Sequence, residues 1–339
     1  MNRITVDKYQ RRANHDYCEI TLTNRNGMVV RLLNHGATIE RVLLPDGHSG
    51  HHDAVMHLAH REDYDRERNF LGGTVGRIIG RMAAGEWTVG TSTQTFDLND
   101  GPNHAHGGPA GFDTQCFDFT LAQTDRDATV TMTLFDPAGH NGYPGNLQLT
   151  ASFTLDDTDV LTYRLDAVAD ALTPCNPANH VYFNLGDGTI EDHVLTLDAS
   201  QYLPLAADSI PHDGAASVQG TVFDLREGQR LGDVLGSSDP QITSQNGLNH
   251  PFLLDGHAVA ATLSLPGTGR RVTLRTTAPS VVVYTANHFD HTGYARDLGR
   301  YDGVALEAQF PPSADPSLSP ILLMPGEHFN AQTSWQFGY

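Results

Sequence analysis

The stretch that decides the fold class is Thr129-Val130-Thr131-Met132-Thr133-Leu134-Phe135, in which a threonine face alternates with an apolar face. Successive side chains of an extended chain point to opposite sides, so this alternation predicts a half-buried β-strand. β-Branched threonine and valine favour this setting because branching restricts χ1. The stretch ends at Asp136-Pro137-Ala138-Gly139, which predicts a turn.

The same period of two recurs on both sides of this stretch. Glu19–Thr23 and Met28–Leu32 flank the sequence Asn24-Arg25-Asn26-Gly27, which predicts two strands joined by a turn. Further alternating runs cover 147–155, 160–165, 260–265, 272–276 and 280–285. Helical periodicity is scarce, with Ala54–Arg61 suited to one or two turns. Without repeats or linkers, residues 1–339 are expected to form one antiparallel β domain, a sandwich of two large sheets.

Composition excludes several classes of protein. A hydrophobic content of 39% in 339 residues can fill a core, which excludes a disordered chain. The net charge of −19 repels phosphate, and no Lys/Arg run has interleaved aromatics, so nucleic acid is not an expected partner. The sequence contains no run of about 18 apolar residues, so no membrane span is predicted. The three cysteines form no CxxC pair, and the N-terminus has no apolar stretch, so we expect a cytoplasmic protein.

The segment Asn99–Gly108 holds a first candidate site, because His104 and His106 lie two apart and can share a face of an extended chain. An HxH pair is compatible with a metal centre, but Pro109–Phe112 supplies no carboxylate, so we predict no metal. The alternative is a pair of surface histidines in a polar turn. Gly107 and Gly108 favour a site, since they allow close approach of a ligand.

Two further segments carry candidate catalytic side chains. His180 stands between amides and an aromatic, strand-like stretch, where it serves either a site or a hydrogen-bonded core. Glu307 interrupts the apolar stretch Val304–Phe310. A buried carboxylate needs a partner or a task, and acting as a base with a raised pKa is one such task.

The glycine-rich stretch 72–81 contains two arginines, Arg77 and Arg81. It lacks GK[ST] and GxGxxG, so a nucleotide site is not predicted. Each guanidinium either lies in a cleft, where it binds hydroxyl oxygens or carboxylates, or tethers the structure internally.

In their order along the chain, these segments resemble the galactose mutarotase (aldose 1-epimerase) family. The stretches that carry the resemblance are Gly76–Arg81, Asn103–Gly108, Gly142–Gly145, Asn179–Leu185, Phe223–Arg226, Gly247–His250, Tyr284-Thr285, Leu306–Gln309 and Pro325–Glu327. The resemblance implies a large twisted antiparallel β-sandwich, the galactose mutarotase-like supersandwich, with a sugar pocket on the concave face of one sheet. It also implies an isomerase that needs no cofactor.

The resemblance implies roles for individual residues. Glu307 would be the general base and His180 the general acid, on opposite sides of a bound pyranose. His106 would be a further catalytic histidine near the ring oxygen. The substrate-binding residues would be Arg81, Gly80, Tyr182 and Asn249.

Three positions depart from the family pattern. Gly80 stands where Asn is common, Asn249 where Asp is usual, and Val282 at a position that is often polar or aromatic. These changes surround the binding groups, so the sugar preference among galactose, glucose and maltose stays open.

The expected partner is a neutral sugar, bound by a monomer or homodimer. A non-catalytic carbohydrate-binding β-sandwich is the main alternative, although binding alone does not require an acid and a base. A glycoside hydrolase usually needs two carboxylates, and the motifs supply one. A hexose-phosphate epimerase would need a further basic cluster to bind the phosphate, and the sequence shows none beyond Arg77 and Arg81.

Overall fold

A computed structural model describes residues 3–12, 14–47, 50–313, 315 and 317–339 of the chain. The predicted strand around Met132 is confirmed as part of β12 (Asp127–Asp136), which pairs antiparallel with β11 (Asp118–Gln123) and β13 (Leu147–Asp156). Val130 and Met132 are fully buried, while the intervening threonines are half-buried. The threonine face is therefore the outer one.

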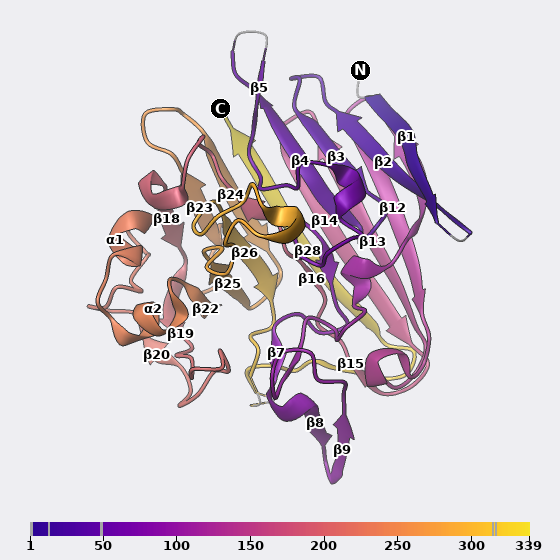
Figure 1. The fold of residues 1–339 in the computed structure, drawn as a ribbon, viewed down its shortest axis with the longest axis vertical. Helices are drawn as coiled ribbons and strands as arrows, with labels where there is room; N and C mark the ends of the chain where they lie inside the picture. The colour runs from indigo at the N-terminus through magenta and orange to yellow at the C-terminus, as the bar shows by residue number, and fades with distance from the viewer. Residues whose placement is uncertain (1–2, 13, 48–49, 314, 316) are drawn as a thin grey trace.

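The largest sheet in the described part of the chain has the strand order β11-β12-β13-β14-β28-β24-β23-β18-β21. Its long strands twist across the back of the molecule (Figure 1). The remaining bounds are β14 (Val160–Ala169), β18 (Val194–Leu197), β21 (Gln229–Arg230), β23 (Ala261–Ser264), β24 (Arg271–Thr276) and β28 (His328–Gly338).

Two sheets form the facing layer. One has the order β1-β2-β3-β4-β5, with β1 (Arg3–Arg12), β2 (His15–Thr23), β3 (Val29–Leu33), β4 (Thr38–Pro45) and β5 (His51–Asp53). The other has the order β17-β26-β25-β22-β19-β20, with β17 (Tyr182–Phe183), β19 (Ala199–Tyr202), β20 (Ala216–Ser217), β22 (Asn249–Leu254), β25 (Ser280–Tyr284) and β26 (Val304–Gln309). Figure 1 shows both in front of the largest sheet.

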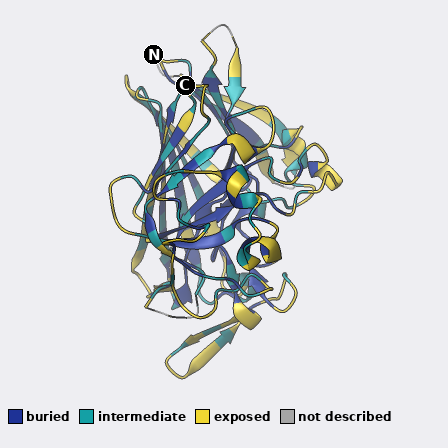
Figure 2. Ribbon diagram, turned by 90° about the vertical axis from the view of Figure 1, so that its left-hand side faces the viewer, coloured by how far each residue is buried: buried dark blue, intermediate teal, exposed yellow. Residues whose placement is uncertain are grey.

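One hydrophobic core joins the two layers. It contains Val30 of β3, Phe153 of β13, Leu274 of β24 and Val283 of β25, all fully buried. The buried strands occupy the centre of Figure 2, while exposed residues gather on the loops and on the β8–β9 hairpin, β8 (Glu86–Val89) and β9 (Ser92–Thr95). The predicted all-β sandwich is confirmed.

Short elements complete the fold. The paired strands are β6 (Thr74–Val75) with β16 (Ala178–Asn179), β7 (Arg81–Met82) with β10 (His104–Ala105), and β15 (Thr173–Pro174) with β27 (Leu322–Leu323). The helices are α1 (Leu231–Leu235) and α2 (Pro240–Gln245). The 3₁₀ turns are η1 (Arg61–Asp63), η2 (Ala83–Gly85), η3 (Phe112–Thr114), η4 (His140–Gly142), η5 (Ile190–Asp192) and η6 (Gly293–Ala295). Within the described ranges, no helix is long and apolar enough to cross a membrane.

The predicted helical turns over Ala54–Arg61 are wrong. Residues 54–60 form no helical turn, and only Arg61 belongs to one, the 3₁₀ turn η1. Two backbone donors of the segment bind neighbouring strands instead. The Ala54 amide donates to the Val42 carbonyl and the Met56 amide to the Tyr182 carbonyl. Donors used in this way cannot make the i→i−4 bonds of a helix.

The register of the β26, β25 and β22 strands prepares one face for a site. Glu307 pairs with Val282, and Val282 pairs with Pro251 on the next strand. Two residues along, Tyr284 pairs with Asn249. Directly opposed residues of antiparallel strands point to the same face, so these side chains form one surface.

Candidate active site

A cavity of about 420 Å³ opens over this face of the sheet. Its wall includes every residue for which the sequence predicted a catalytic or binding role: Gly80, Arg81, His106, His180, Tyr182, Asn249 and Glu307. They come from β7, β17, β22 and β26 and from the loops between strands, so residues more than 200 positions apart meet here.

His180 and Glu307 lie next to each other in the cavity wall. The Nε2 atom of His180 lies 3.4 Å from Oε1 of Glu307, and both side chains are about 4% exposed. The expectation that the two groups stand on opposite sides of a sugar ring is therefore wrong, because no ring fits between atoms in contact. The pair instead faces the cavity side by side, and Nδ1 of His180 has no hydrogen-bond partner among the described residues.

The second carboxylate oxygen of Glu307 is held separately. Oε2 accepts a hydrogen bond of 3.3 Å from Nε2 of Gln309, two residues along the same strand. Residues i and i+2 of a strand share a face, so Gln309 also lines the cavity.

Burial moves the pKa values of the pair in opposite directions. Loss of hydration raises the pKa of Glu307 to about 8, against smaller lowering effects of Arg81 and the Gln309 amide. Loss of hydration also lowers the pKa of His180 to about 4. Both shifts disfavour the charged form, as expected for groups removed from water.

His106 completes a histidine pair. Its ring centroid lies 5.5 Å from that of His180, and the two ring planes make an angle of 65°. Burial and then the neighbouring His180 lower the pKa of His106 well below its ordinary value. The His106 amide donates to the Gly80 carbonyl at 2.9 Å, so Gly80 helps to position this histidine through its backbone.

The sequence analysis missed Phe70, which packs against both histidines. Its ring centroid lies 4.6 Å from that of His106 and 6.0 Å from that of His180. The Arg68 guanidinium lies over the Phe70 ring, with its Cζ atom 4.5 Å from the ring centroid. It also donates to the Asp113 carboxylate and to the His106 carbonyl. No periodicity or motif in residues 64–71 indicated this role, because it depends on contacts with distant segments.

Arg81 and Asn249 lie on the cavity wall with defined partners. Nε of Arg81 donates to Oδ2 of Asp100 at 2.6 Å. Nδ2 of Asn249 donates to Oε1 of Gln245 at 3.2 Å, which leaves the Asn249 oxygen as the group able to accept from a ligand. Within the described residues, no group of three or more His, Cys, Asp or Glu side chains is arranged to hold a metal.

Comparison with known proteins places this geometry in a family. The sequence signature of the family described as Aldose 1-epimerase matches residues 19–336. The aldose 1-epimerase of Escherichia coli (strain K12) is 34% identical over 334 residues, covering 95% of each chain. The chain belongs to the aldose 1-epimerase family.

Other members of the family are similarly close. The galactose mutarotase of Bos taurus is 35% identical, covering 91% of this chain and 90% of its own. The crystal structure of galactose 1-epimerase from Lactobacillus acidophilus NCFM matches with a TM-score of 0.94 at 47% identity, covering 99% of both chains. The resemblance predicted from the motifs is thereby confirmed.

Some residues of the motifs shared with the aldose 1-epimerase family lie outside the cavity wall. Arg77 is fully buried away from it, where its Nε binds the Asp136 carboxylate. Of the two alternatives for Arg77, the internal tether is the one observed. His104 also lies outside the cavity wall, since its ring nitrogens contact the Tyr143 hydroxyl and the Asp97 carbonyl.

Proposed function

We propose that this protein is an aldose 1-epimerase, an isomerase that interconverts the α and β anomers of a hexose. The observation that carries the proposal is the His180–Glu307 contact in the wall of a sugar-sized cavity. Mutarotation requires removal of the proton from the anomeric hydroxyl and protonation of the ring oxygen. Both oxygens are bonded to C1, so a base and an acid that lie side by side can reach them together.

The pair catalyses the reaction while it holds one proton. Ionised Glu307, the general base, takes the proton of the anomeric hydroxyl, and protonated His180, the general acid, gives a proton to the ring oxygen, which opens the ring to the aldehyde. Rotation about C1–C2 exposes the other face of the carbonyl. Ring closure then reverses both transfers and restores the pair. Each general acid or base typically contributes 10²–10⁴-fold.

The other cavity residues hold the sugar. We assign His106 to the neighbourhood of the ring oxygen and the Arg81 guanidinium to ring hydroxyls. Gly80, Tyr182 and Asn249 complete the contact surface. The substrate is a neutral sugar such as galactose or glucose, or the reducing end of maltose. We further propose that the chain acts as one domain, as a cytoplasmic monomer or homodimer without nucleic-acid or membrane partners.

Polarimetry on freshly dissolved α-glucose, α-galactose and α-maltose tests the proposal. The protein should accelerate the approach of at least one sugar to its anomeric equilibrium. Glu307→Gln and His180→Asn should each lower kcat/KM by at least about a hundredfold, because each removes one proton-transfer group and keeps a similar shape.

His104→Gln serves as the matched control for loss of an imidazole, since His104 lies outside the cavity wall; its rate should exceed that of His180→Asn. Near-normal turnover in either active-site variant would contradict the mechanism. Sugar binding without acceleration by the unmodified protein would instead favour a carbohydrate-binding protein.

A further inference from the structure

The side chain of Gln309 is buried and only half satisfied. The residue is 2% exposed and its Nε2 donates to Glu307, yet its Oε1 has no partner among the described residues. Exchanging the amide nitrogen and oxygen would bring Oε1 against a carboxylate oxygen, so the hydrogen bond fixes this orientation while Glu307 is ionised. An unpaired buried acceptor is costly, which indicates that a ligand supplies the missing donor.

Residue 80, which has no side chain, lies next to the Gln309 amide. A Cβ atom at Gly80 would lie 3.7 Å from Oε1 of Gln309 and 3.1 Å from Pro312. Gly80 has a φ of +77°, a conformation that suits glycine. Gln309 thus lines the same cavity as the reactive pair, and its buried amide oxygen has no hydrogen-bond partner among the described residues.

The two carboxylate oxygens of Glu307 define two directions. Oε1 contacts His180, and Oε2 contacts Gln309. If Glu307 binds the anomeric hydroxyl on C1 and His180 binds the ring oxygen, the ring carbon on the other side of C1 lies toward Gln309. That neighbour is C2, which carries a hydroxyl in glucose and galactose.

We propose that Gln309 is both a positioning residue for Glu307 and a specificity-determining residue, whose Oε1 accepts a hydrogen bond from the C2 hydroxyl of the sugar. This inference rests on the proposed function. It assigns to the enzyme a preference for aldoses with a free C2 hydroxyl over their 2-deoxy counterparts. The positioning role has its own consequence, because the amide donor favours the ionised carboxylate.

The test compares glucose with 2-deoxyglucose by polarimetry, after subtraction of each spontaneous rate. The unmodified protein should prefer glucose in kcat/KM by about tenfold, the usual effect of one hydrogen bond to a buried group. Gln309→Met removes the acceptor, so the two sugars should become equivalent. Gln309→Glu keeps an acceptor oxygen and should retain a preference. Gln201→Met, at an exposed glutamine of β19, should leave the preference unchanged.

The pH dependence separates positioning from a loss of packing. Gln309→Met should move the alkaline limb of kcat/KM to higher pH, because the hydrogen bond that lowers the pKa of Glu307 is absent. A preference for glucose that survives in Gln309→Met, or equal rates for both sugars with the unmodified protein, would overturn the proposal for Gln309. Failure to accelerate any sugar would overturn the proposed function itself.

Discussion

Glu307 and His180 owe their ionisation to the same dry surroundings. Burial raises the pKa of the carboxyl to about 8 and lowers that of the imidazole to about 4. At neutral pH the shared proton therefore resides on Glu307. The cycle starts once this proton passes to His180, whose Nε2 lies 3.4 Å from Oε1 of Glu307, because the base must be ionised and the acid protonated.

The pH profile of kcat/KM follows from these two values. Above about pH 8, Glu307 loses its proton and the pair has no acid. Below about pH 4, His180 gains a proton and the pair has no base. We expect a plateau between these limits, and the two apparent values belong to the coupled pair.

Polarimetric rates across this range check the prediction, with the spontaneous rate subtracted at every pH. Without burial, the limbs would fall near the ordinary values of 4.5 for a glutamate and 6.5 for a histidine. An alkaline limb near 6.5 would therefore contradict the assigned effect of burial.

The sequence identifies the reactive residues better than their supporting contacts. His180 and Glu307 stand in motifs that can be recognised from the order of residues alone. The contact of Phe70 with His106 joins segments 36 positions apart, and no local pattern encodes it. The arrangement of the pair was also mispredicted, because motif positions carry no information about the distance between side chains.

At the scale of elements, the two-residue alternation of apolar side chains predicted the strands, whereas no sequence period predicted helices α1 and α2. The runs around Val130, Leu149 and Val281 became β12, β13 and β25, because two-residue periodicity extends over enough positions to be recognised. Helices α1 and α2 are too short to display a 3.6-residue period. A capping signal for α2 was present, since Asp239 precedes Pro240 and accepts from the Gln241 amide at 2.8 Å.

Arg77 joins elements that would otherwise meet only through loops. Its guanidinium donates to the carboxylate and carbonyl of Asp136 at the end of β12, and to the carbonyls of Pro144 and Gly145. It also reaches the Thr173 hydroxyl of β15 at 3.1 Å. Every N–H of the side chain is thereby satisfied in the interior.

Arg77→Met should destabilise the protein by about 3–5 kcal/mol, because it leaves the buried Asp136 carboxylate without its guanidinium partner. Urea unfolding of the variant and the unmodified protein measures the difference. Arg230→Met is the matched control, since Arg230 makes an exposed ion pair with Asp192 and its loss should not be measurable. Equal effects of the two substitutions would show that Arg77 is no tether.

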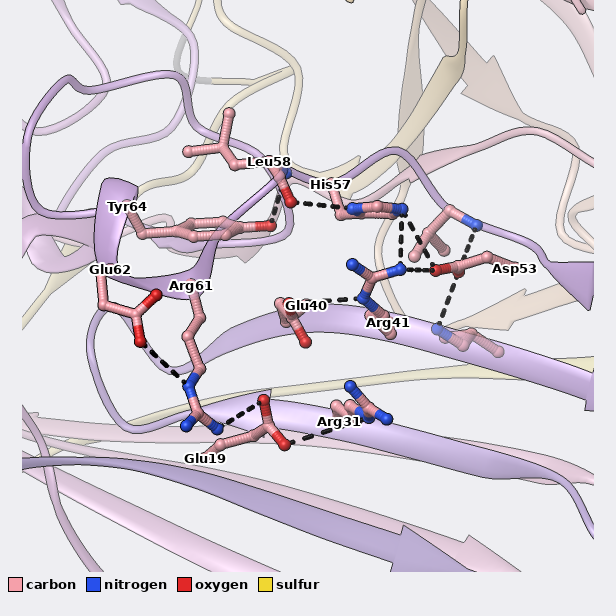
Figure 3. Close-up of polar contacts among 12 residues, drawn as sticks. Glu19, Arg31, Glu40, Arg41, Asp53, His57, Leu58, Arg61, Glu62 and Tyr64 are labelled. Carbon is pink, nitrogen blue, oxygen red and sulfur yellow. Dashed lines mark hydrogen bonds and ion pairs between the residues drawn. The ribbon is translucent and has the colours of Figure 1, made fainter. Parts of the chain in front are cut away.

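At the scale of the whole molecule, charged side chains connect the N-terminal sheet to the segment that ends at the active site (Figure 3). Arg61 of η1 binds Glu19 of β2 at 3.1 Å. On β4, Arg41 contacts Asp53 of β5 and the His57 ring. The chain that follows His57 continues to Phe70, whose ring packs against His106 in the cavity wall.

Glu40 is the least satisfied member of this cluster. It is 3% exposed, and its Oε2 has no hydrogen-bond partner among the described residues. Burial raises its pKa to about 7, an effect that Arg41 opposes and Glu19 reinforces. Above that pH the folded protein must hold a buried, incompletely paired charge.

Glu40→Gln should therefore stabilise the protein at alkaline pH. A raised pKa in the folded state means that the contribution of Glu40 to stability is present below the unfolded value of 4.5 and is lost as the pH rises through about 7. The advantage of the variant should grow across this window by up to about 3 kcal/mol, since each pH unit between two such values corresponds to about 1.4 kcal/mol. Urea unfolding at several pH values measures it, with the exposed Glu62→Gln as a control that should show no such trend. If the free energies of unfolding of Glu40→Gln and the unmodified protein differed by the same amount at every pH, Glu40 would ionise as readily in the folded protein as in the unfolded chain, which would contradict the prediction.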